Sequence, residues 1–423
     1  MPRRLTVVQL LPALHSGGVE RSTLEIAEAL VRAGHRAIVV SAGGRLVPQL
    51  EAGGAEHIAL AIGRKSPLTL LHVRRLRALF AELGADIVHA RSRLPAWIGW
   101  LALRAMPAVQ RPRFVTTVHG LNSPSRYSAI MARGERVICV SETMREYVLK
   151  HYPDTEAATL RVIPRGIDPA AFPRMECPDR DARARIAALH PMLGGDGPLL
   201  LLPGRGTRLK GHADASMLLA ALRRDGLDAR LWMPGAREPG REAYIAGIEA
   251  EAMRIGVADA LAITPPTAAI AEAYAASDLV LQVSRKPESF GRTVIEALSC
   301  GRPVAGWAHG GAGELLRELL PAGAVAPFDA DALHRAARDL LAQAAAVPAT
   351  MPASLQRYSL EAMQTATRTC YRELLQARTR ETIPEWPTRR PPTPRPRPSA
   401  GVGRHSGCWR SLRCGRCRAS PKA

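Results

Sequence analysis

The 423-residue sequence predicts an α/β protein with two domains, each built on a doubly wound parallel sheet. The length is sufficient for two hydrophobic cores of ordinary size, and 47% of the residues are hydrophobic. Two short apolar runs, 5–11 and 199–203, are each followed by a glycine-rich loop. Such a loop after a buried strand is typical of parallel sheets that bind ligands beyond the carboxyl ends of their strands.

Composition divides the chain into five segments. We expect a first domain over 1–170, a linker rich in Pro, Gly and charge over 171–197, and a second domain over 198–350. A terminal helical segment follows over 351–380. The Pro/Arg-rich tail, 381–423, contains too little apolar surface to fold and is expected to be disordered.

In the first domain, apolar runs between loops predict the strands, and one of the two expected helices, 67–83, is a basic amphipathic run. We expect helices over 19–33 and 67–83. The expected strands cover 5–11, 36–41, 86–90, 114–119, 136–140 and 160–163. Arg91 and Arg93 fall in a predicted loop after the third of these strands, where they could face an anionic substrate on the acceptor side.

The second domain has the same alternation. A helix is expected over 270–277, and another begins after Ser289 and ends before Gly301 and Pro303. The terminal segment is expected to form a helix over 355–375. The expected strands cover 199–203, 230–234, 262–264 and 278–284.

The net charge of +20 is concentrated in two places. The tail from 385 to 423 holds ten basic residues and one acid, and the segment 64–113 holds ten basic residues against Glu82 and Asp86. The second concentration suggests an anionic membrane surface or a negatively charged acceptor, although solvated helix faces would give the same count.

The sequence gives no sign of a membrane span or a signal peptide. The run 94–109 is interrupted by Pro95, Arg104 and Pro107, so we expect it at most at a surface. The start of the chain carries two arginines before an apolar run but no small-residue cleavage pattern. Seven cysteines without regular spacing through most of the chain favour reduced thiols and a cytoplasmic location.

The stretch 284–304, SRKPESFGRTVIEALSCGRPV, has the clearest chemical signature. It places Glu288 in a turn after a buried strand and Glu296 on the following helix, with Ser289 expected as the helix N-cap. Gly291 would let the backbone come close to a ligand. Free N–H groups and the partial positive charge of a helix N-terminus favour a phosphate there.

Seven residues separate Glu288 from Glu296, and the pair is framed by Phe290–Gly291 and by Gly301 to Val304. This pattern resembles the E-x7-E region of retaining glycosyltransferases of family four. Other parts of the chain resemble that family in the same order. They are the first loop with Gly17 and Gly18, His119 followed by glycine, the G-R-x4-K-G pattern with Arg205 and Lys210, and the glycine-rich turn before Glu314.

The resemblance implies the GT-B fold, in which two Rossmann-like domains face an interdomain cleft and the terminal helix returns to the first domain. It implies transfer of a sugar from a nucleotide diphosphate sugar to a hydroxyl acceptor with retention, without a metal or a further cofactor. It also suggests lipopolysaccharide or another surface glycan as the product, made at the inner face of the cytoplasmic membrane, and no specific nucleic-acid partner.

Roles follow from the resemblance position by position. Glu288 and His119 would be catalytic, and Glu296 would bind the ribose. Arg165 stands where many members have Asn, which leaves its role open. The residues implied in binding the donor diphosphate are Arg205, Lys210, Gly17, Gly18, Phe290 and Gly291.

Two other functions and two metal motifs compete with this interpretation. A nucleotide-sugar epimerase could use the same fold, and a non-catalytic carbohydrate- or nucleic-acid-binding protein could use the basic tail. Asp329 and Asp331 resemble a D-x-D metal triplet, but their place before a helix favours capping. Four possible zinc ligands lie in the tail, but their spacing matches no zinc pattern that we trust. They are His405, Cys408, Cys414 and Cys417.

Overall fold

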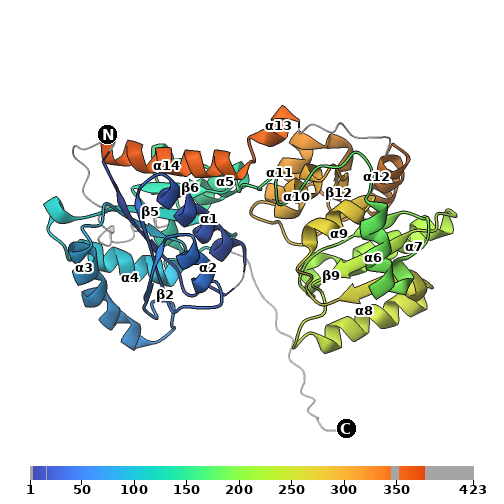
Figure 1. Ribbon diagram of the computed structural model, residues 1–423, viewed down its shortest axis with the longest axis horizontal. Coiled ribbons are helices and arrows are strands. Elements are labelled where there is room, and N and C mark those ends of the chain that lie inside the picture. Colours follow the sequence, from blue (N-terminus) through green and yellow to red (C-terminus); the bar gives the residue numbers. More distant parts are fainter. Residues whose placement is uncertain (1–2, 16, 344–351, 377–423) are drawn as a thin grey trace, which may run out of the picture. The chain divides into compact units, whose positions relative to one another are not determined.

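The computed structural model describes residues 3–15, 17–343 and 352–376 (Figure 1). The predicted tail and its His/Cys motif lie outside these residues. The described chain forms a seven-stranded and a six-stranded sheet, and every strand pair in both is parallel. The two doubly wound sheets predicted from the sequence are therefore present.

The first sheet has the strand order β3-β2-β1-β4-β5-β6-β7. The order reverses between β1 and β4, and loops at such a reversal leave room for a ligand. Its strands are β1 Thr6–Leu10, β2 Arg36–Ser41, β3 Glu56–Ala59, β4 Ile87–Ala90, β5 Arg113–Val118, β6 Arg136–Cys139 and β7 Leu160–Val162. The helices between them are α1 Gly18–Arg32, α2 Val47–Ala52, α3 His72–Glu82, α4 Arg93–Arg104 and α5 Glu142–His151.

Alternating side chains of the first sheet pack against different helices. Val7 of β1 belongs to a buried cluster with Ile26 of α1, whereas Val8 belongs to a cluster with Phe80 of α3 and Trp100 of α4. Both faces of the sheet are thus covered, which explains why its strands are nearly continuous apolar runs. The C-terminal helix α14 contacts α1 and completes the first of these clusters (Figure 1).

The second sheet has the order β10-β9-β8-β11-β12-β13, with the reversal between β8 and β11. Its strands are β8 Leu199–Leu201, β9 Arg230–Pro234, β10 Leu261–Thr264, β11 Leu279–Gln282, β12 Val304–Trp307 and β13 Ala324–Val325. The helices from the linker onward are α6 Arg180–Leu189, α7 His212–Arg224, α8 Glu242–Arg254, α9 Ile270–Ala276, α10 Arg292–Ser299, α11 Gly310–Leu319, α12 Ala330–Ala342, α13 Ala353–Gln356 and α14 Leu360–Gln376.

Two predicted helices are interrupted. The one expected over 67–83 begins as a 3₁₀ turn, Pro67–Leu71, and becomes α-helical only at His72. The one expected over 355–375 is broken between α13 and α14, because Ile167 forms a bridge with Ser359. In that bridge the N–H of Ile167 donates to Tyr358 O at 2.9 Å and the N–H of Leu360 donates to Ile167 O at 2.7 Å.

The expectation that 94–109 lies at a surface was wrong. Most of this run forms α4, in which Ala96, Ile98 and Leu103 are at most 1% exposed. Pro95 lies in the first turn, where its missing N–H costs nothing, and Arg104 lies at the end. The interruptions therefore mark the ends of a core helix.

Candidate functional site

The strand predicted over 278–284 is present, and so are the loop and the helix predicted within 284–304. Strand β11 ends at Gln282 and α10 begins at Arg292. The N-cap residue is Gly291 and not Ser289, so that detail of the prediction was wrong. Gly291 has φ +114°, and a Cβ atom there would lie 2.7 Å from Ala312 Cα, so both the backbone conformation and the packing require glycine.

Ser289 instead connects the loop to the first sheet. Its hydroxyl donates to the carbonyl oxygen of His119 at 2.7 Å, and its own carbonyl accepts from Ser141 Oγ at 2.7 Å. His119 follows β5 and Ser141 follows β6. Residues beyond the carboxyl ends of strands in both sheets therefore meet at this loop.

Glu288 forms an ion pair with Lys210, with 2.6 Å between Oε1 and Nζ. Ser284 Oγ also donates to Glu288 Oε1 at 2.6 Å. Burial alone would raise the pKa of the Glu288 carboxyl, but the charge of Lys210 and these hydrogen bonds outweigh it, so the pKa lies below its ordinary value. Glu288 is therefore ionised at neutral pH.

The position of Lys210 is set by the turn after β8. Lys210 ends a short 3₁₀ turn, and Gly211 adopts φ +75° where a Cβ atom would lie 2.0 Å from Val283 O. The exposed side chain of Arg205, in the same loop, has no hydrogen bond or ion pair to another described residue. One of the two predicted diphosphate ligands is thus paired with Glu288, and the other is exposed.

Glu296 lies on α10 and is 9% exposed. The hydroxyl of Tyr274 donates to its Oε2 at 2.9 Å. Burial raises the pKa of the Glu296 carboxyl, and Arg292 and the tyrosine hydrogen bond oppose this shift only in part. Arg292 itself pairs with Glu25 of α1 at 3.0 Å, a contact that no motif in the sequence indicated.

His119 stands at the end of β5, as the sequence predicted. Its Nδ1 lies 2.6 Å from Nη2 of Arg165, and its Nε2 is buried with no hydrogen-bond partner among the described residues. Burial, and after it the charges of Arg165 and Arg91, lower the pKa of His119 well below its ordinary value. His119 is therefore neutral at physiological pH.

The remaining predicted residues have different surroundings. Gly17 caps α1 and Gly18 begins it, and a Cβ atom at Gly18 would meet no atom within 4 Å. Phe290 is 5% exposed and packs against Tyr358, so only its backbone could face a diphosphate.

Arg91 and Arg93 do not form a common loop surface. Arg91 is 4% exposed, and its guanidinium donates to Gln9 and Ser22. Arg93 begins α4, donates to Ser128 Oγ at 3.2 Å and lies over the ring of Tyr127.

Two acidic motifs have capping roles. Asp329 accepts from the N–H of Ala332 at 2.8 Å, which confirms the predicted helix cap. Glu314, which follows the glycine-rich turn noted in the sequence, accepts from the N–H groups of Glu142 and Thr143 at the start of α5. Within the described residues, no group of three or more His, Cys, Asp or Glu side chains could hold a metal ion.

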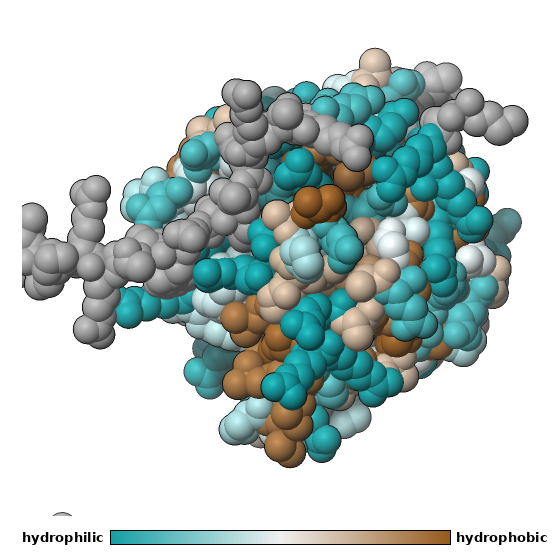
Figure 2. All heavy atoms as spheres, turned by 90° about the vertical axis from the view of Figure 1, so that its left-hand side faces the viewer, coloured by the Kyte–Doolittle hydropathy of each residue, from teal (hydrophilic) through white to brown (hydrophobic). Residues whose placement is uncertain are grey.

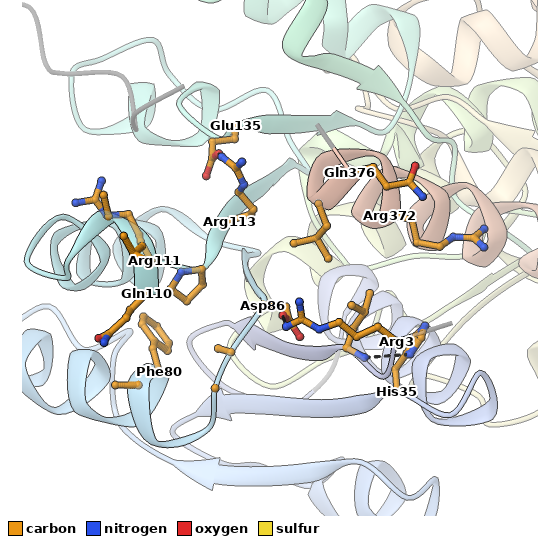
Figure 3. A pocket seen from close by; sticks show the side chains of 18 of the residues that line it. Arg3, His35, Phe80, Asp86, Gln110, Arg111, Arg113, Glu135, Arg372 and Gln376 are labelled. Atoms are coloured by element: carbon orange, nitrogen blue, oxygen red, sulfur yellow. Dashed lines mark hydrogen bonds and ion pairs between the residues drawn. The ribbon is translucent and has the colours of Figure 1, made fainter. Parts of the chain in front are cut away.

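A pocket of about 1430 Å³ lies at the amino-terminal edge of the first sheet (Figure 3). Its labelled side chains include Arg3, Asp86 and Arg113 beside the starts of β1, β4 and β5, and Arg372 from α14. None of the predicted site residues lines it. The pocket therefore lies at the end of the first sheet where its strands begin, opposite the end that carries the predicted site residues.

Comparisons with known proteins agree with this arrangement. Residues 16–171 match the family model described as Glycosyltransferase Family 4, and residues 192–358 match the model described as Glycosyl transferases group 1. A D-inositol 3-phosphate glycosyltransferase from Xylanimonas cellulosilytica is 30% identical over 262 residues. The match covers 56% of this chain and 59% of that relative, so it spans less than two thirds of the relative's length.

Solved structures share this fold over most of the chain. A glycosyltransferase from Rickettsia africae ESF-5 is similar with a TM-score of 0.75 and 26% identity, over 88% of this chain and 99% of that one. HepE from Anabaena in complex with UDP-glucose has a TM-score of 0.71 and 20% identity, over 88% and 100% of the two chains.

These matches confirm the predicted GT-B fold, with two Rossmann-like parallel-sheet domains. They also confirm the resemblance found in the sequence, because both family models are those of glycosyltransferases and together they span most of the chain. The chain is therefore similar to the family 4 glycosyltransferases, with one glycosyltransferase family model matching each of its two domains.

Proposed function

We propose that this protein transfers a sugar from a nucleotide diphosphate sugar to a hydroxyl acceptor and retains the configuration of the anomeric carbon. The observation that carries the proposal is the Lys210–Glu288 ion pair at 2.6 Å, held beside the N-terminus of α10. It brings a cation, a carboxylate and free backbone N–H groups to one place, where a diphosphate sugar needs all three.

The leaving diphosphate gains negative charge as the bond between the anomeric carbon and the phosphate oxygen breaks. Lys210 and Arg205 would stabilise that charge, supplying what a divalent cation supplies in other sites. Glu288 would stabilise the positive charge that develops on the sugar ring. Glu296 would accept hydrogen bonds from the ribose hydroxyls, because only one of its carboxylate oxygens is bound by Tyr274.

Retention is proposed without a protein nucleophile. The acceptor hydroxyl would attack on the face from which the diphosphate leaves, and a diphosphate oxygen would accept its proton. Glu288 is occupied by Lys210 and Ser284, so it acts in this scheme through charge and does not form a bond to the sugar.

For the acceptor, we propose a glycolipid or surface glycan such as lipopolysaccharide, reached at an anionic membrane surface. The segment from Arg64 to α3 presents Leu68, Leu70 and Leu71 at 58–70% exposure among basic residues. Figure 2 looks onto the side where Figure 1 shows α3, and hydrophobic patches alternate there with hydrophilic side chains. Exposed leucines beside cations suit a lipid surface with negative headgroups.

Not all the basic residues counted in the sequence contribute to that surface. Arg91 is buried, and Arg113 is paired with Glu135. No described helix is long and apolar enough to span a bilayer. The proposed association is therefore with the face of a membrane.

A panel of radiolabelled nucleotide sugars tests the proposed activity. Release of the nucleoside diphosphate with transfer or hydrolysis of the sugar supports a transferase, whereas conversion to an epimer of the donor supports the epimerase alternative. Binding without turnover of any donor would support a non-catalytic carbohydrate-binding protein.

Two variants test the assignment of residues. Glu288→Gln and Lys210→Ala should each reduce turnover, whereas Lys150→Ala, an exposed lysine at the end of α5, should not. Unchanged turnover in the first two would refute the proposed site. Flotation with vesicles containing phosphatidylglycerol tests the membrane surface, and the substitution of Leu68, Leu70 and Leu71 by Ser should abolish it.

A further inference from the structure

Two arginines are buried beyond the carboxyl ends of the first sheet with no ion pair to any described carboxylate. Arg91, after β4, is 4% exposed, and Arg165, after β7, is 8% exposed. A buried cation that lacks a counter-charge is costly, because the desolvation of the guanidinium is not repaid. Such a pair of residues points to an anion that is supplied by a ligand.

The guanidinium of Arg91 is held in a fixed position by neutral groups. Gln9 donates through Nε2 to Thr23 O at 3.1 Å, which turns its Oε1 toward Arg91. Arg91 Nε and Nη2 donate to that oxygen at 3.0 Å and 2.5 Å. These contacts orient the guanidinium and leave its positive charge unneutralised.

Arg165 fixes the tautomer of His119. A guanidinium can only donate, so the Nδ1 atom 2.6 Å from Arg165 Nη2 must be the unprotonated acceptor of the ring. The ring is neutral, and its proton is therefore on Nε2. That buried N–H has no acceptor among the described residues, so it is a donor available to a substrate oxygen.

The neighbouring acids do not neutralise this cluster. Glu25 pairs with Arg292 at 3.0 Å and with Arg21 at 3.5 Å. Burial, followed by repulsion from Arg91 and Arg292, lowers the pKa of Arg165 to about 9, although Glu25 and Glu20 act in the opposite direction. The side chain of Arg165 makes a single hydrogen bond within the described residues, so most of its N–H groups are free.

We propose that Arg91, Arg165 and the Nε2–H of His119 bind an anionic group, a phosphate or a carboxylate, on one of the two substrates. The group is additional to the donor diphosphate, which Arg205 and Lys210 would hold from the second domain. The inference rests on the proposed transferase function and specifies its substrate class. The anionic group can belong to the donor sugar or to the acceptor, and these sources are separated below.

The test compares substrates that differ only in the charged group. Isothermal titration calorimetry of the full chain measures UDP-glucuronic acid against UDP-glucose for the donor, and glucose 6-phosphate against glucose, with saturating UDP, for the acceptor. We expect the anionic member to bind at least tenfold more tightly in one of the two pairs. The pair that shows the preference identifies the substrate that carries the group.

Three variants assign that preference to residues. Arg165→Asn, which introduces the residue many family members have there, and Arg91→Gln should each reduce the ratio of the two dissociation constants at least fivefold. Arg104→Gln is the matched control, because Arg104 is exposed at the end of α4 and lies over the Trp100 ring. It should keep the ratio of the unsubstituted protein.

The outcomes distinguish this inference from the proposed function. A ratio near one in both pairs, or a ratio unchanged in both Arg165→Asn and Arg91→Gln, overturns the anion site. A variant with a lower melting temperature but an unchanged ratio of dissociation constants would indicate a purely structural role for the substituted arginine. Thermal unfolding of each variant measures that melting temperature. If no nucleotide sugar binds or turns over at all, the transferase function itself fails.

Discussion

Replacement of Lys210 by Ala should have separable effects on stability and on turnover. The ion pair to Glu288 is 2.6 Å long, and both side chains are 26% exposed. Exposed pairs contribute about 0–1 kcal/mol and removal of one partner of a buried pair costs about 3–5 kcal/mol. For this partly buried pair we expect a loss of about 1–2 kcal/mol in the free energy of unfolding.

The effect on turnover should be larger. If Lys210 stabilises the leaving diphosphate, its loss removes one preorganised charge, for which a decrease in kcat of about 10²–10³-fold is typical. The donor KM should change less, because the stabilised charge develops only in the transition state. Steady-state kinetics with the donor identified by the panel would measure both quantities.

A double-mutant cycle with Glu288→Gln isolates the pair. Urea unfolding of the two single variants and the double variant at pH 7 should give a coupling energy of about 1 kcal/mol. The folded-state pKa of Glu288 lies below its ordinary 4.5, so this stabilisation is present above pH 4.5 and is lost as pH falls through the lower folded value. A coupling energy indistinguishable from zero at pH 7, or a kcat equal to that of the unsubstituted protein, would refute the reasoning.

Two further substitutions and one chemical labelling experiment test the local geometry. Gly291→Ala should lower the free energy of unfolding by about 1–3 kcal/mol, because φ is +114° and Ala312 Cα lies 2.7 Å from the new Cβ; urea unfolding that matches the unsubstituted protein would contradict this. Glu296→Gln keeps an acceptor for Tyr274. The raised folded pKa of Glu296 costs stability once pH exceeds the ordinary 4.5, so the variant should gain stability relative to the unsubstituted protein as pH rises from 4 to 7; a pH-independent difference in melting temperature would argue against the raised pKa. Of the described cysteines, exposed Cys177 should react first with iodoacetamide at pH 8, since the other three are buried; peptide mapping that finds one of those alkylated earlier would contradict the burial.

The fold could be predicted because the strands of both sheets are buried on two faces. Val7 and Val8 pack against different helices, so the first strand is a continuous apolar run that a sequence displays directly. The same reasoning misjudged α4. Prolines and an arginine within 94–109 resemble breaks in the sequence, but their places at the ends of a helix depend on where that helix begins.

The chemistry of the site was predictable where it depends on local order and not where it depends on distant partners. Glu288 and Lys210 were each indicated by neighbouring residues in the chain. The role of Ser289 depends on the carbonyl of His119, which is 170 residues away. The contact of Arg165 with His119 likewise spans 46 residues and two strands, and no periodicity in either segment indicates it.

The packing of α14 on the first domain has a consequence for folding during synthesis. His89 of β4 is fully buried and lies 2.6 Å from the hydroxyl of Tyr371, 282 residues later in the chain. Met363 and Leu374 of α14 complete the same cluster as Ile26 of α1. The ribosome must therefore release the whole second domain before the first can close its core. The nascent first domain exposes an apolar helix face for that interval, and a chain truncated before α14 retains this exposed face permanently.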